Sequence, residues 1–257
     1  MQTKTAPVKR PYRNKKKKPI PLRFWIGMSM LGAIGLLFLY VEFFGERHTS
    51  VWPKGHDIYG IDVSHFQKNV NWQKVQENNI SFAFIKATEG NYLKDKEFER
   101  HWKEAGQAGI IKGAYHFYRP RLSPEKQASN FIETVQLSNG DLPPVLDVEH
   151  RGLKSGARFR EELQTWLNLV ERAYNTKPIL YTNYQFYKDH LEGYFDNYPL
   201  WIAHYQVPKL RISPGHNIKL SFWQHTDIGT VEGVEGKVDC NVFYGSMRDL
   251  RKLCIEN

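Results

Sequence analysis

Two carboxylates separated by one residue end an apolar run in the middle of the chain, at Asp147 and Glu149. If residues 145–149 form a strand, alternate side chains point to opposite faces, so the two acids share a face and Leu146 and Val148 share the other. Two carboxyl groups held this close cannot both ionise easily, which raises the pKa of one of them. A general acid needs such a raised pKa at neutral pH. The segment therefore predicts one wall of an acidic site.

Strand and helix patterns alternate along the chain from residue 57 onward. Strands are predicted at 58–62, 82–87, 111–117, 145–149 and 179–182, with helices between them at 72–76, 96–108, 124–137 and 158–174. Three further strands, at 200–203, 220–225 and 238–243, are separated by turn-rich connections. This pattern predicts an α/β fold, an irregular TIM-like (β/α) barrel with a β-rich C-terminal closure.

Acidic residues fall at the strand ends where such barrels hold their active sites. Asp62 ends the first strand, Asp147 and Glu149 end the middle one, and Asp239 lies in the last. A single acid at a strand end is more often a turn residue, but four from distant strands predict one acidic site. Aromatic residues recur at the same ends and suit stacking on sugars, although such residues more often belong to the core: Tyr115, Tyr118, Tyr181, Trp201, Tyr205 and Trp223.

The net charge of +9 is confined to the N-terminal tail. Nine of the 36 basic residues, and no acid, lie in residues 1–23, whereas the other 27 basic residues balance all 27 acids. A nearly neutral body lacks the basic patch that binding to DNA or RNA requires. We therefore expect no nucleic-acid partner.

An uncharged run of 18 residues, 24–41, follows the tail. As a helix it would extend roughly 27 Å, close to the hydrocarbon thickness of a bilayer. A secretory signal peptide is the alternative, but the tail is long and residues 40–44 offer no small-residue cleavage site. We predict an uncleaved signal anchor with a cytoplasmic tail, a linker at 42–56 and a periplasmic or extracellular barrel domain at 57–257.

Short segments spread over about residues 57–245 carry a joint resemblance. They are 57–67 (DIYGIDVSHFQ), Asn71-Trp72, 82–90 (FAFIKATEG), 113–117 (GAYHF), 146–149 (LDVE), 201–203 (WIA), Trp223-Gln224 and 239–243 (DCNVF). Together they resemble glycoside hydrolase family 25, the muramidase-type lysozymes. The resemblance implies an irregular barrel that cleaves the β-1,4 bond between N-acetylmuramic acid and N-acetylglucosamine in peptidoglycan strands. It implies Glu149 as proton donor, Asp147 as its partner, and Asp62 and Asp239 as flanking acids. For this enzyme we expect no cofactor and no metal.

The same chemistry follows from the residues. A glycosidic oxygen is a poor leaving group, so one carboxylic acid must protonate it while nearby negative charge supports the oxocarbenium ion. Glu149 has the longer reach and is the predicted general acid. The separation of residues i and i+2, roughly 6.6 Å, lies between the spacings of retaining and inverting enzymes. Asp147 could therefore attack, activate water, or stabilise a ring formed by the substrate's own acetamido group.

Two other functions fit parts of the pattern. A membrane-anchored peptidoglycan-binding module would keep the aromatic residues, yet all four acids are also present. A metal-dependent polysaccharide deacetylase could use Asp62, His65, His116 and His150, although no pair of them has a recognised ligand spacing. Cys240 and Cys254 could form one bridge in an oxidising compartment or remain thiols.

Overall fold

A computed structural model describes residues 51–212 and 218–256. The predicted tail at 1–23, the predicted membrane span at 24–41 and most of the linker lie outside the described residues. Within the described ranges, no helix is long and apolar enough to cross a bilayer. The predicted barrel domain lies almost entirely within them, and its first strand begins at Tyr59.

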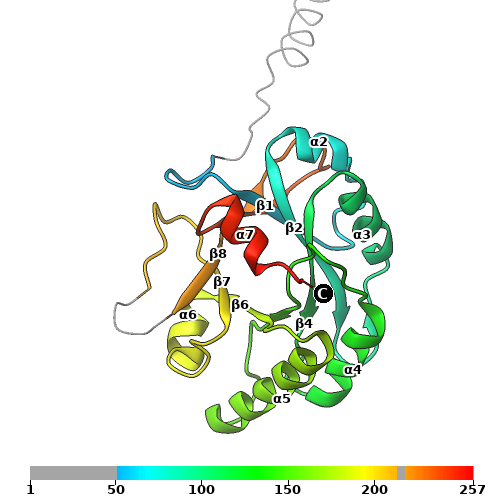
Figure 1. Ribbon diagram of the computed structural model, residues 1–257. Coiled ribbons are helices and arrows are strands. Elements are labelled where there is room, and N and C mark those ends of the chain that lie inside the picture. Colours follow the sequence, from blue (N-terminus) through cyan, green and yellow to red (C-terminus); the bar gives the residue numbers. More distant parts are fainter. Residues whose placement is uncertain (1–50, 213–217, 257) are drawn as a thin grey trace, which may run out of the picture. The chain divides into compact units, whose positions relative to one another are not determined.

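In the described part of the chain, nine strands form one sheet in the order β1-β9-β8-β7-β6-β5-β4-β2-β3, and a further pairing of β1 with β2 closes eight of them into a barrel (Figure 1). The short β3 pairs with β2 outside the closed ring. The strands are β1 (Tyr59–Val63), β2 (Ile80–Glu89), β3 (Leu93–Lys94), β4 (Ile111–Phe117), β5 (Val145–Asp147), β6 (Ile179–Asn183), β7 (Pro199–Ala203), β8 (Lys219–Gly229) and β9 (Val238–Phe243). The predicted α/β barrel is confirmed.

Helices follow the strands of the first half of the barrel and lie around its outside (Figure 1). Three of them begin at side-chain caps, because Asn71, Ser123 and Ser155 accept hydrogen bonds from the first helical turn. After β6 the connections shorten, which confirms the predicted β-rich closure. The helices are α2 (Trp72–Glu77), α3 (Phe98–Gln107), α4 (Pro124–Thr134), α5 (Gly156–Tyr174), α6 (Tyr184–Phe186), the π-helix η1 (Tyr187–Leu191) and α7 (Met247–Leu253).

The direction of β9 determines which of its ends reaches the barrel mouth, meaning the end where the parallel strands finish. Strands β1, β2 and β4 to β8 run parallel, whereas β9 is antiparallel to both β1 and β8. The N-terminal end of β9 therefore lies at the mouth. Asp239, the second residue of β9, is the direct cross-strand partner of Asp62.

Aromatic rings fill the barrel interior below the mouth. Phe84 stacks on Trp201 with ring centroids 4.2 Å apart, and Phe222 lies 5.0 Å from Phe84 and 5.1 Å from Phe243. Phe82 completes this cluster, and its ring is fully buried. Outward-facing residues of the same strands form a second cluster against the helices. The mouth is thus built on a solid floor of rings.

Gly60 provides a test of this floor. A Cβ atom there would overlap the ring of Phe82. We expect Gly60→Ala to lower the free energy of unfolding by about 1–3 kcal/mol, because the buried ring has to move. Urea denaturation measures the change. Gly106→Ala in α3 is the control, since its Cβ would meet only the flexible Lys112 side chain at 3.4 Å. Equal stability of the Gly60 variant and the unsubstituted protein would contradict the packing.

Candidate active site

The structure brings the four predicted acids together at the barrel mouth. Asp62 lies near the end of β1, Asp239 at the start of β9, and Asp147 at the end of β5. Glu149 follows two residues later, and its charge acts on the other three carboxyl groups. In the ring order, β9 and β5 occupy opposite positions. The acids therefore line a site that extends across the mouth.

Strand β5 is shorter than predicted but keeps its alternation. It ends at Asp147 rather than at Glu149. Backbone hydrogen bonds still hold the segment in register, because Val148 N donates to Tyr181 O at 2.9 Å and Tyr118 N donates to Asp147 O at 2.9 Å. Leu146 and Val148 are buried in the cluster beneath the helices. The two acids consequently share the inner face, as predicted.

A network of side chains holds the Asp62 carboxylate. Gln224 Nε2 and Asn241 Nδ2 both donate to Asp62 Oδ2, each at 2.8 Å. Trp201 Nε1 donates to Asn241 Oδ1 at 2.8 Å, and the hydroxyl of Tyr181 donates to Gln224 Oε1 at 2.8 Å. An indole N–H can only donate, so it turns the amide oxygen of Asn241 toward itself and the amide nitrogen toward Asp62. The network thus fixes the orientation of this buried acid.

Asp62 and Asp239 share a proton at neutral pH. Burial raises the pKa of Asp62 to about 6, although the hydrogen bonds from Asn241 and Gln224 oppose this rise. Burial, together with the charge of Asp62 and the hydrogen bond between the two carboxyls, raises the pKa of Asp239 to about 9. Two carboxyl groups this close titrate as a pair. The pair therefore carries one negative charge near pH 7.

Asp147 and Glu149 differ in exposure. Asp147 is 6% exposed, and its Oδ1 has no hydrogen-bond partner among the described residues. Burial, then the charges of Glu149 and Asp62, raise its pKa well above the usual range. Glu149 is exposed, and partial desolvation raises its pKa while His150, Lys86 and Arg119 oppose the rise. Glu149 can thus reach a ligand while Asp147 lies behind it.

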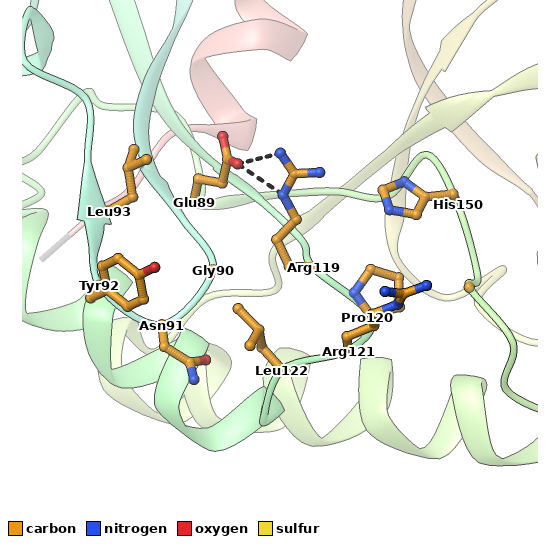
Figure 2. A pocket seen from close by; sticks show the side chains of 11 residues that line it. Glu89, Gly90, Asn91, Tyr92, Leu93, Arg119, Pro120, Arg121, Leu122 and His150 are labelled. Atoms are coloured by element: carbon orange, nitrogen blue, oxygen red, sulfur yellow. Dashed lines mark hydrogen bonds and ion pairs between the residues drawn. The ribbon is translucent and has the colours of Figure 1, made fainter.

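A cluster of charges beside the acids was missed from the sequence. Lys86, only 8% exposed, points from β2 and contacts Glu89 with Nζ 2.6 Å from Oε2. Arg119 Nε donates to Glu89 Oε1 at 2.8 Å (Figure 2). Burial opposes ionisation of Glu89, but these two cations outweigh it and lower its pKa. Both cations also lie over the ring of Phe117. The sequence signal that could have indicated this cluster was Lys86, the one charged residue in the predicted strand 82–87.

The predicted sugar-binding aromatic residues separate into two groups. Tyr115 and Tyr205 are partly exposed at the mouth, and Tyr205 donates to Gln224 Oε1 at 2.7 Å. Tyr181 is 8% exposed and belongs to the Asp62 network. Trp201 lies in the floor at 2% exposure, and Trp223 lies in the outer cluster at 1%. Because neither indole has an open face, the structure does not support sugar stacking by Trp201 or Trp223.

The residues proposed for a metal site lie apart. His65 Nδ1 pairs with Asp95 Oδ2 at 2.7 Å. His116 is buried between Thr88 and Gln127 on the outer side of the barrel, and His150 is exposed beside Glu149. Across residues 51–212 and 218–256, no three His, Cys, Asp or Glu side chains are grouped so that they could hold a metal ion.

The two cysteines are buried thiols. No disulfide joins Cys240 to Cys254 in the described part of the chain. Instead, the Sγ of Cys254 donates to Leu250 O at 3.3 Å. Burial raises the pKa of this thiol to about 11, so it remains protonated.

Comparisons with known proteins identify relatives of this chain. Residues 61–234 match the model of the glycosyl hydrolases family 25. The YegX protein of Escherichia coli K12 is 42% identical over 82% of this chain and 80% of its own length. Lysozyme M1 of Streptomyces globisporus is 35% identical over 76% of this chain and 71% of its own length. The crystal structure of the bacterial lysozyme from Streptomyces coelicolor is similar with a TM-score of 0.72 and 35% identity, covering 78% of this chain and 98% of that one.

The shared proton predicts a pH dependence of stability. A carboxyl whose folded pKa is raised costs stability as pH rises from its unfolded pKa, about 4, toward its folded value. Asp239→Asn keeps a donor to Asp62 but removes this cost. We expect the variant to match the unsubstituted protein at pH 4 and to exceed it at pH 9 by on the order of a few kcal/mol in the free energy of unfolding.

Urea denaturation at a series of pH values measures the difference between the two proteins. Asp57→Asn is the control, since Asp57 is exposed and precedes β1, at the end of the barrel opposite the mouth. Parallel pH profiles for Asp239→Asn and the unsubstituted protein would show that no proton is held between Asp62 and Asp239.

Proposed function

This chain belongs to the glycosyl hydrolases of family 25, and we propose that it is a muramidase that hydrolyses the β-1,4 bond between N-acetylmuramic acid and N-acetylglucosamine in peptidoglycan. The names of its relatives, among them a lysozyme and an N,O-diacetylmuramidase, support this activity. The observation that carries the proposal is the exposed Glu149 carboxyl beside three aspartates at the barrel mouth.

Glu149 is the proposed general acid. Its side chain is the most exposed of the four acids, and its raised pKa lets it keep a proton at higher pH than an ordinary glutamate. It donates that proton to the glycosidic oxygen as the bond to the anomeric carbon breaks. The pair Asp62 and Asp239, on the other side of the mouth, holds one negative charge that favours the positive charge developing on the sugar.

Asp147 is the proposed stabiliser of an intermediate made by the substrate. Its buried Oδ1 has no partner in the described part of the chain, and a buried acceptor without a donor is costly. The N–H of the substrate's acetamido group would supply that donor while its carbonyl oxygen attacks the anomeric carbon. Water then opens the ring, with Glu149 taking its proton. This route retains the anomeric configuration.

Glu149→Gln tests the assignment of the general acid. We expect the variant to lose about 10²–10⁴-fold in kcat on purified peptidoglycan, because an amide cannot donate the proton. Mass spectrometry of the digest should find muramic acid at the new reducing ends made by the unsubstituted protein. Glu161→Gln, an exposed position on α5, is the matched control and should keep full activity.

Three outcomes contradict the proposal. Glucosamine at the new reducing ends would mean that the other glycosidic bond is cut. Absence of cleavage would favour a binding module. Activity that is lost to a chelator but retained by Glu149→Gln would favour a metal-dependent deacetylase.

We infer that residues 24–41 anchor the enzyme in a membrane with residues 1–23 in the cytoplasm and the barrel outside it. The uncharged run and the nine basic residues before it support this orientation. Only residues 42–58 separate this run from the first strand of the barrel at Tyr59, so the tether between anchor and barrel is short. The catalytic site would therefore act on wall material close to the membrane.

Protease treatment of intact spheroplasts tests this orientation. We expect digestion of the barrel epitope while an epitope tag placed before residue 1 stays protected. The mass of the purified protein checks the anchor itself. A mature form that is soluble and begins near residue 45 would mean that the segment is a cleaved signal peptide.

A further inference from the structure

A pocket of about 480 Å³ is lined in part by His150, the residue that follows Glu149. Its walls come from the segments that follow three neighbouring strands, β2, β4 and β5, so it lies at the barrel mouth. Figure 2 shows Tyr92 and Leu93 on one side and His150, the residue after Glu149, on the other. The lining residues are Glu89–Leu93, Arg119–Leu122, His150 and Gly152.

The pocket has the opposite charge to the acidic side of the mouth. Glu89 is neutralised by Lys86 and Arg119 together. The side chain of Arg121 is exposed and makes no ion pair or hydrogen bond within the described ranges of the chain. An unpaired arginine with a fixed fork of donors is suited to a carboxylate. The pocket therefore favours an anionic ligand.

Other groups in the pocket could contact apolar and N–H groups of a ligand. Tyr92 is 83% exposed and Leu93 is 41% exposed, so apolar surface is open here. Asn91 Oδ1 is buried and has no hydrogen-bond partner among the described residues, which leaves an acceptor for an N–H group. A ligand with amide N–H groups, small apolar side chains and free carboxylates would meet all three features. A short acidic peptide has this chemistry.

Resting on the proposed function, we propose that this pocket binds the peptide attached to the lactyl group of muramic acid, with its carboxylate at Arg121 and an amide N–H at Asn91. The muramic acid residue occupies the mouth next to Glu149, so its substituent is close enough to enter the adjacent pocket. The enzyme then prefers glycan strands that carry peptides to strands from which the peptides have been removed.

The test compares kcat/KM of the full-length protein on peptide-bearing glycan and on glycan stripped by an amidase. We expect Arg121→Ala to lower kcat/KM on the peptide-bearing strands about fivefold more than on the stripped strands. Arg121→Lys should recover part of the preference because it keeps the charge. Arg172→Ala is the control, an exposed arginine in the last turn of α5, and should change neither value.

A binding measurement separates this inference from the catalytic one. Full-length Glu149→Gln protein is titrated with a soluble stem peptide, and we expect saturable binding that Arg121→Ala weakens about fivefold. If the Glu149→Gln protein binds the peptide but the unsubstituted protein cleaves neither glycan, the pocket stays assigned and the proposed function is overturned. If Arg121→Ala lowers kcat/KM equally on both glycans, Arg121 contacts the sugar or its lactyl carboxylate, and the peptide site is overturned. Glycan cleavage by the unsubstituted protein without binding of the soluble peptide would also overturn the peptide site.

Discussion

Closure of the barrel through β1 is the constraint on which the site depends. β1 pairs with β2 in parallel and with β9 in antiparallel orientation, so the start of β9 meets the end of β1. This reversal sets Asp239 against Asp62. Neighbouring strands also offset the cost of burying the Asp62 carboxylate, because Gln224 of β8 and Asn241 of β9 donate hydrogen bonds to it. One topological feature thus creates an acidic pair and stabilises it.

Acidic and basic side chains lie on different sides of the barrel mouth. Asp62 and Asp239 lie on the closing strands β1 and β9, whereas Lys86 lies on β2 and Arg119 follows β4, the strand next to β5. Burial raises the pKa of each of the four acids, and His150, Lys86 and Arg119 oppose that rise at Glu149. The general acid in our proposal follows β5, next to the cationic side and across the mouth from β9. Its pKa therefore reflects a balance between desolvation and neighbouring cations rather than a single contact.

Local patterns in the sequence predicted the strands and the shared face of Asp147 and Glu149, because alternation with Leu146 and Val148 is a property of the segment itself. The direction of β9 could not be predicted, since alternation of inward and outward residues is the same in a parallel and an antiparallel strand. Burial of Trp201 and Trp223 depends on neighbours from other strands, so their exposure was misjudged. Lys86 pairs with Glu89 only three residues on, but Arg119, which also binds Glu89, lies 30 residues along the chain, and no local pattern predicts that contact.

The aromatic floor has a consequence for a polymeric substrate. Phe82, Phe84 and Phe222 leave no passage along the barrel axis, so the mouth has a single open side. A long glycan cannot thread through the protein and has to lie across the mouth with both of its ends free. An enzyme of this shape does not need a chain terminus to begin. It can cut strands at internal positions and release the two halves by the path through which the strand arrived.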